Sequence, residues 1–290
     1  MCSCFLLCFK NIRKMEGEYT MINVNEILHR IIAEFQSIEQ VTAIAIAGSK
    51  FSNYQDDLSD ININVYYISP ISEETRSQIL TKFSSDIELD CVGPVQTDHF
   101  RLRDFLIEID VCYLSFEEIE TKLINLMKYA KVNRNESTKV AYCVHYSNIV
   151  FDRHGKLNQL KQDYTLSYPD ELRRNIIQLN YPMLKAQSKS YYNQFERALN
   201  RRDQIHIISL LNDYLKSYLE IISAMNKQFD PIEKRVLQIV DETCSILPKM
   251  LKENIELLFV YASRCDKQLL QVVTIMINQL TDLMNEQGLL

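Results

Sequence analysis

The chain has 290 residues, of which 47% are hydrophobic, with only 5 Gly and 6 Pro. This composition is typical of a folded two-domain protein and excludes a disordered or low-complexity chain. Acidic residues (38) outnumber basic ones (32), and the net charge of −6 disfavours nucleic acid as the main partner. No apolar run approaches the ~18 residues of a membrane span, so we expect no membrane partner and a cytoplasmic location.

The N-terminal segment 1–20 does not resemble a secretory signal. Its apolar core, Cys4 to Phe9, is too short, and the basic residues follow it instead of preceding it. We therefore expect residues 1–20 to be a disordered or non-native extension. The eight cysteines include no Cys-x-x-Cys pair and no histidine at zinc spacing, which favours reduced thiols.

The first half of the chain alternates between helical and strand patterns. Apolar spacing predicts a helix over 23–35, and the apolar run 41–47, which ends at Gly48-Ser49, predicts a buried strand and a tight turn. The alternating segment 61–67 predicts a second strand. Further on, we expect a helix over 73–83 capped by Ser72, a strand over 87–92, an alternating strand over 105–113 and a helix over 116–130. The apolar segment 142–150 fits either a helix or a strand.

Polar side chains gather on one face of two of these strands. Asp60, Asn62 and Asn64 lie opposite the isoleucines of the strand 61–67, because successive side chains of a strand point to opposite faces. Glu108 and Asp110 lie in the same way on the strand 105–113. If the two strands are neighbours with their apolar faces together, these acids converge on one patch. Clustered oxygen ligands suit a magnesium ion that holds nucleotide phosphates.

Gly48-Ser49, Asp60-Ile61-Asn62 and Asp110 follow the order and spacing of a known pattern. At these residues the chain resembles nucleotidyltransferases of the DNA polymerase beta-like superfamily. The likeness is closest to the lincosamide and aminoglycoside nucleotidyltransferases and to stand-alone bacterial nucleotidyltransferase-like proteins with a C-terminal helical domain. It covers most of the chain from about Met21. Asn62 stands where the family carries an acid.

The resemblance implies a role for each matching residue. Gly48, Ser49 and Ser59 would hold the phosphates of a nucleoside triphosphate. The resemblance implies that Asp60, Asn62 and Asp110 bind Mg²⁺ and that Asp60 and Asp110 are catalytic. Glu108, on the face of Asp110, is a candidate for the carboxylate that Asn62 lacks. The alternative is structural: Asp60 caps a turn and Asp110 is a surface position of a strand.

Helical periodicity dominates beyond Ser167. We expect helices over 169–179, 183–199, 204–225, 231–246, 249–262 and 268–285, with Pro182 and Pro248 ending or kinking them. Asp230 followed by Pro231 and Glu233 predicts a capping box for the helix that starts at 231. By resemblance Lys234 would reach the nucleotide phosphates, although a solvated lysine is as good an interpretation. The tyrosines near 191 and 214–218 fit a stacking surface or, more often, a core.

These patterns together predict an α+β protein. A nucleotidyltransferase-type mixed sheet with flanking helices would occupy residues 21–165, and an all-helical bundle would occupy 166–290. The resemblance implies Mg²⁺-dependent transfer of a nucleoside monophosphate, AMP from ATP, to a hydroxyl of a small molecule or protein. Because Asn62 replaces an acid, the alternative is an inactive protein that binds a nucleotide or a partner, as an antitoxin does.

Overall fold

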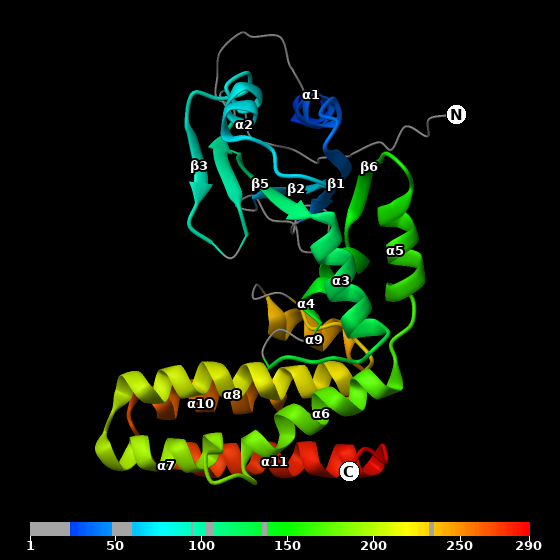
Figure 1. Cartoon of the computed structure of the whole chain (residues 1–290). Helices are drawn as coiled ribbons and strands as arrows, with labels where there is room; N and C mark the ends of the chain where they lie inside the picture. Colours follow the sequence, from blue (N-terminus) through cyan, green and yellow to red (C-terminus); the bar gives the residue numbers. More distant parts are fainter. Residues whose placement is uncertain (1–23, 48–59, 94, 103–106, 135–137, 232–234) are drawn as a thin grey trace. The chain divides into compact units, whose positions relative to one another are not determined.

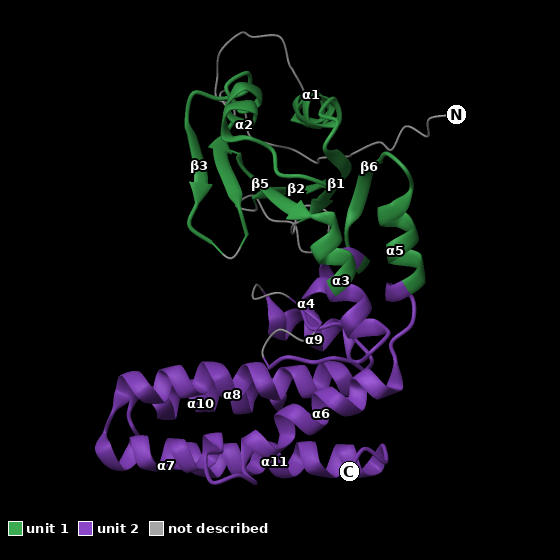
Figure 2. Ribbon diagram, in the orientation of Figure 1, with its two compact units in different colours: residues 1–121, 145–163 green, residues 122–144, 164–290 purple. Residues whose placement is uncertain are grey.

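The computed structural model describes residues 24–47, 60–93, 95–102, 107–134, 138–231 and 235–290 (Figure 1). The chain divides into two compact units, residues 1–121 with 145–163, and residues 122–144 with 164–290 (Figure 2). Helices α3 (Phe116–Met127) and α5 (Lys156–Thr165) each begin in the first unit and end in the second. The sequence interpretation kept 21–165 together, whereas the structure assigns 122–144 to the helical unit.

The first unit contains a six-stranded mixed sheet in the order β3-β4-β5-β2-β1-β6. Its strands are β1 (Val41–Ala47), β2 (Ile61–Tyr67), β3 (Ile87–Cys91), β4 (Thr97–Arg101), β5 (Glu108–Ser115) and β6 (Asn148–Asp152). β2 and β5 are parallel neighbours, and the other pairs are antiparallel. The predicted α+β class is confirmed, and β2 and β5 are neighbours, which is the condition under which the sequence places their acids on one patch.

One face of this sheet, here called the inner face, carries the core of the first unit. Helices α1 (Val24–Gln36) and α2 (Glu73–Leu80) supply its cover. The isoleucines and valines of β2 and β5 pack with Leu28, Ile31 and Phe35 of α1, and all of them are fully buried. Ser72 caps α2 by accepting a hydrogen bond from the Thr75 amide at 3.3 Å, as predicted.

Several elements between β3 and α6 differ from the sequence interpretation or go beyond it. β4 and α5 were not predicted, because both are rich in charged and polar residues. The undecided segment 142–150 contains both alternatives, since α4 (Lys139–His145) ends before β6 begins. A turn over 153–155 follows β6, and Gly155 adopts a left-handed conformation there, with φ of 69°.

The described residues from Tyr168 onward form helices and no strands, as predicted. Besides α4, the second unit has α6 (Asp170–Leu184), α7 (Tyr191–Arg201), α8 (Gln204–Met225), α9 (Val236–Thr243), α10 (Leu251–Ser263) and α11 (Gln268–Glu286). No helix in the described part of the chain combines the length and apolarity that crossing a membrane requires. Tyr214 and Tyr218 are fully buried, and their stacked rings lie 5.6 Å apart, so these tyrosines belong to the core.

Several helix boundaries in this unit differ from the predicted ones. Pro182 lies in the last turn of α6 instead of ending it, because the helix stops two residues later and little hydrogen bonding is lost. The next helix begins only at Tyr191, where Ser190 caps it. The predicted capping box at Asp230 involves Glu233, which lies outside the described residues; the described helix α9 starts at Val236, after Arg235 in a left-handed conformation. The Asp230 amide instead donates to Thr138 Oγ1 at 2.7 Å.

Candidate functional site

The register of the parallel strands places two predicted site residues together. Asn62 of β2 pairs directly with Asp110 of β5, while Ile61 and Ile109 pair beside them in the buried core. Asn62 and Asp110 therefore share the opposite face of the sheet, here called the outer face. Asp60 immediately precedes β2, and Glu108 is the first residue of β5. The outer face is covered further along β2, where Asn64 and Tyr66 are buried, so its accessible part lies at the start of the strand.

The same register continues across the sheet. Glu88 of β3 pairs with His99 of β4, His99 pairs with Asp110, and Asn62 pairs with Ala47 of β1. We call Glu88, His99, Asp110 and Asn62 the outer row. Ala47 is the last residue of β1, so Gly48 follows the neighbour of Asn62 directly in the chain. Gly48, Ser49, Ser59 and Lys234, which the sequence predicts to bind phosphates, lie outside the described residues.

His99 is a member of the outer row that the sequence did not indicate. Its Nδ1 lies 2.8 Å from Asp110 Oδ1, and both side chains are about one-third exposed, at 31% and 29%. This hydrogen bond raises the pKa of His99, with the negative charges of Asp110, Glu108 and Glu88 adding to it and partial burial opposing it. Protonated His99 thus supplies positive charge to Asp110. Recognising β4 would have revealed it, because alternation then places His99 beside Asp110.

Glu108, the acid proposed to compensate for Asn62, also has a basic partner. Arg101 Nη2 donates to Glu108 Oε1 at 2.7 Å, and this hydrogen bond lowers the pKa of Glu108. Both side chains are well exposed, at 50% and 40%. Glu108 is therefore ionised at neutral pH, with Arg101 as its counter-ion.

The oxygen donors of this face suit a cation that brings other ligands with it. Within the described ranges, no group of three or more His, Cys, Asp or Glu is arranged to hold a metal ion. Mg²⁺ in nucleotide sites takes one or two protein carboxylates and fills its remaining positions with phosphate oxygens and water. In the number and type of their oxygen donors, Asp60, Asn62 and Asp110 match that smaller requirement. They do not form an all-protein cage.

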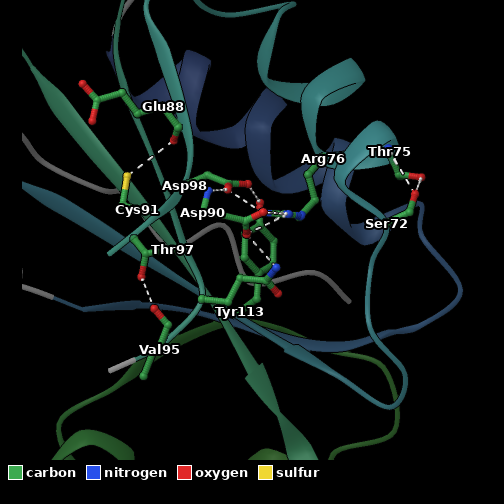
Figure 3. A network of polar contacts seen from close by, with 11 residues as sticks. Ser72, Thr75, Arg76, Glu88, Asp90, Cys91, Val95, Thr97, Asp98 and Tyr113 are labelled. Carbon is green, nitrogen blue, oxygen red and sulfur yellow. Dashed lines mark hydrogen bonds and ion pairs between the residues drawn. The ribbon is translucent and has the colours of Figure 1, made fainter. Parts of the chain in front are cut away.

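A second charged cluster occupies the inner face of the same strands (Figure 3). We call Arg76, Asp90, Asp98 and Tyr113 the inner network. The Arg76 guanidinium pairs with Asp98 through Nη1 and with both carboxylate oxygens of Asp90 through Nη2, at 2.9 and 3.1 Å. The Tyr113 hydroxyl donates to Asp98 Oδ2 at 2.8 Å. Arg76 and Asp98 are 1% and 0% exposed, so this network is part of the core.

A β-bulge brings Asp90 into the inner network. The β3–β4 register shifts between Glu88 and Cys91, and Asp90 adopts a left-handed conformation with φ of 52°. Simple alternation would place Asp90 on the same face as Glu88. The bulge turns it instead toward Arg76, and its amide donates to Asp98 Oδ1 at 3.0 Å. This departure from alternation is invisible in the sequence pattern.

Comparisons with known proteins found a family match and similar solved structures. Residues 134–235 match the family described as "Domain of unknown function (DUF4037)". The crystal structure of a nucleotidyltransferase-like protein from Exiguobacterium sibiricum 255-15 is similar to this chain at 12% sequence identity and a TM-score of 0.44, over 91% of this chain and 76% of that one. A search of curated proteins found no match. The family match begins after β5, so it includes none of the strands that carry the outer row.

Proposed function

We propose that this protein is a Mg²⁺-dependent nucleotidyltransferase that transfers AMP from ATP to a hydroxyl of a small molecule or protein. The observation that carries the proposal is the direct pairing of Asn62 with Asp110 on parallel strands, with Asp60 just before Asn62. It gives a spatial basis to the motif by which the sequence resembles nucleotidyltransferases. Gly48-Ser49, which follows the neighbouring strand end at Ala47, supplies the phosphate-binding part of the motif.

The proposed reaction assigns a task to each residue. The acceptor oxygen forms a bond to the α-phosphorus while the bond to the bridging oxygen breaks and pyrophosphate leaves. Asp110 holds the acceptor hydroxyl and takes its proton, and Asp60 with Asp110 provides the negative charge that retains Mg²⁺. Bound Mg²⁺ would neutralise charge on the phosphate oxygens. His99 orients Asp110 through the 2.8 Å hydrogen bond.

One specific observation favours a second candidate, a protein that binds a nucleotide or a partner without transfer. Asn62 contributes no charge, and the carboxylates of Asp110 and Glu108 already have His99 and Arg101 as partners. A face whose negative charge is compensated by its own cations attracts Mg²⁺ less strongly. Nucleotide binding without turnover would be the signature of this candidate.

Calorimetric titration with ATP and Mg²⁺, together with a pyrophosphate-release assay, tests the proposal. Asp60→Asn and Asp110→Asn should each weaken Mg²⁺-dependent ATP binding by roughly tenfold or more, because each removes a ligand charge. Glu286→Gln, at an exposed helix end, is the matched control and should bind like the wild type. Unchanged ATP binding in both aspartate variants would contradict the proposed site.

Two further variants decide between the enzyme and the binding protein. If Glu108 compensates for Asn62, Glu108→Gln should lower pyrophosphate release at least tenfold while Asn62→Asp changes it little. If nothing compensates, the wild type should be nearly inactive and Asn62→Asp should raise Mg²⁺ affinity. An active wild type that is insensitive to Glu108→Gln would leave the Asn62 oxygen as a sufficient ligand and remove the role of Glu108.

A further inference from the structure

The second unit contains a pocket of about 360 Å³ that the proposed reaction does not use. One stripe of α8 forms its floor, and the start of α4, the segment around Asp230 and the start of α9 complete it. The lining residues are Lys139, Asn212, Leu215, Lys216, Leu219, Glu220, Asp230, Pro231 and Val236. The volume is within the range of small-molecule sites, about 300–1,000 Å³. The match to the domain of unknown function, 134–235, includes every lining residue except Val236.

Two acids line this pocket: Glu220 is buried and Asp230 is partly exposed. Glu220 is 3% exposed and accepts a hydrogen bond from Asn180 Nδ2 at 2.8 Å. Burial, followed by the nearby charge of Glu220, raises the pKa of Asp230 to about 7, although Lys139 and Lys216 oppose the shift. The negative charge of ionised Asp230 is therefore not fully balanced by the positive charges of Lys139 and Lys216. A positive group placed beside these two acids would relieve that cost.

Other features of the lining restrict what that positive group can belong to. Lys139 and Lys216 line the same pocket and would repel a ligand that carries positive charge alone. A ligand with only negative charge would meet Glu220 and Asp230. Leu215, Leu219, Pro231 and Val236 supply apolar surface. The pocket therefore offers acidic, basic and apolar contacts within one small volume.

Two buried polar atoms in this region also have unsatisfied hydrogen-bonding capacity. Within the described residues, the Tyr168 hydroxyl and the Asn180 side-chain oxygen are buried without a hydrogen-bond partner. Asn180 contacts Glu220 directly. The charges of Glu220 and Asp230 both contribute to a raised pKa of Tyr168, after its burial. Unsatisfied polar atoms in a core cost free energy and mark regions whose hydrogen bonding is incomplete in the protein alone.

We propose that this pocket binds a small zwitterion with an apolar body, the class to which free apolar α-amino acids belong. The ligand's ammonium would lie against Glu220 and Asp230, its carboxylate would face Lys139 and Lys216, and its apolar part would pack on the leucines of α8. This site can be tested separately from the proposed nucleotidyl transfer, because that reaction assigns no task to any of its lining residues. Its occupancy can be measured without any assay of that reaction.

Titration calorimetry on the full chain with three matched compounds tests the charge pattern. L-leucine carries both charges, isoamylamine only the positive charge, and 4-methylpentanoate only the negative charge. We expect L-leucine to bind at least tenfold more tightly than either analogue. Equal binding of one analogue, or no detectable binding of L-leucine and L-valine at millimolar concentration, would overturn the proposal.

Substitutions of the lining locate the binding. Asp230→Asn and Lys216→Met should each weaken L-leucine binding at least tenfold, while Glu256→Gln, an exposed acid of α10, should change it less than twofold. Asp230→Asn leaves the amide that bonds Thr138 in place, so the local backbone is retained. Circular dichroism confirms folding, and Lys216→Met gives an independent measure if Asp230→Asn fails to fold. Binding unaffected by both substitutions would contradict this location.

The pH dependence supplies a further test. The titratable groups acting on Asp230 are Glu220 and Lys216 of α8, Lys139 of α4 and, through its coupling, Tyr168 before α6. L-leucine binding should strengthen from pH 6 to pH 8 in the wild type as Asp230 ionises. In Asp230→Asn the dependence should largely disappear. The same pH profile in both proteins would show that Asp230 does not contact the ligand's ammonium.

Discussion

The inner network and the outer row use the same strands for opposite purposes. Asp98 and His99 are consecutive residues of β4, yet Asp98 pairs with Arg76 in the core while His99 pairs with Asp110 at a partly exposed surface. Both arrangements join a carboxylate to a cation at hydrogen-bonding distance. They differ in access to water: Asp98 is fully buried and Asp110 is 29% exposed.

This difference determines what each cluster can do. A buried ion pair has given up its hydration, so removing one partner leaves a charge that nothing else can satisfy. A partly exposed pair keeps water as a competitor, so its carboxylate can exchange a protein cation for a ligand at small cost. The inner network is therefore suited to fixing β3 and β4 on α2, and the outer row is suited to binding.

The largest expected effect is on the inner network. Asp98→Asn should lower the free energy of unfolding by about 3 kcal/mol, because Arg76 loses its buried counter-ion and keeps only the partly exposed Asp90. Urea unfolding followed by circular dichroism measures this change. The matched control is Asp110→Asn on the outer row, which should cost less than about 1 kcal/mol. Equal losses in the two variants would show that burial does not separate the two clusters.

A smaller, pH-dependent effect is expected for His99→Gln. The pKa of His99 in the folded protein is raised, so its contribution is fully present below the ordinary histidine pKa and is lost as pH rises through the raised value. The wild type should exceed His99→Gln in stability by less than about 1 kcal/mol at pH 5.5. The two proteins should be equal at pH 9. Urea titrations at both pH values check this, and a difference that grows with pH would contradict it.

The smallest effect is expected at the most exposed pair. Arg101→Gln removes the counter-ion of Glu108 at a site where both side chains are largely solvated. The midpoint of thermal unfolding should remain the same within measurement error, and so should its salt dependence. A clear drop in the midpoint would show that this exposed pair stabilises the fold as the inner network does, and that exposure does not determine the loss of stability.

The parts of the fold set by hydrophobic periodicity could be predicted from the sequence. The bounds of α8 were predicted correctly because its apolar stripe is long, and β2 with β5 were predicted from their alternation. β4 was not predicted, because its sequence, TDHFR, has charged side chains on both faces of the strand. Its inward Asp98 is acceptable only because Arg76 lies opposite, and a contact between distant residues leaves no local pattern.

The candidate site shows the same division. The shared face of Asn62 and Asp110 could be predicted from the alternation of strand side chains, once the two strands were assumed to be neighbours. The position of His99 could not be predicted without recognising β4. Asp230 was assigned to a helix cap from its local sequence, but the helix starts at Val236, and Asp230 lines a pocket beside Glu220. Local rules predict caps and faces. They do not predict which charges become desolvated together.

The position of β6 at the edge of the sheet has a consequence for synthesis of the chain. β1 pairs with β6 through Ala43 and Asp152, so one edge of a very apolar strand has no partner until the ribosome has released more than half of the protein. Unpaired apolar edges promote association between chains. The same delay applies to β2, whose parallel partner β5 arrives only after β3 and β4 have been made. The outer row can therefore form only after β5 has been made, and nascent chains that end before Asn148 would depend on chaperones to keep β1 from aggregating.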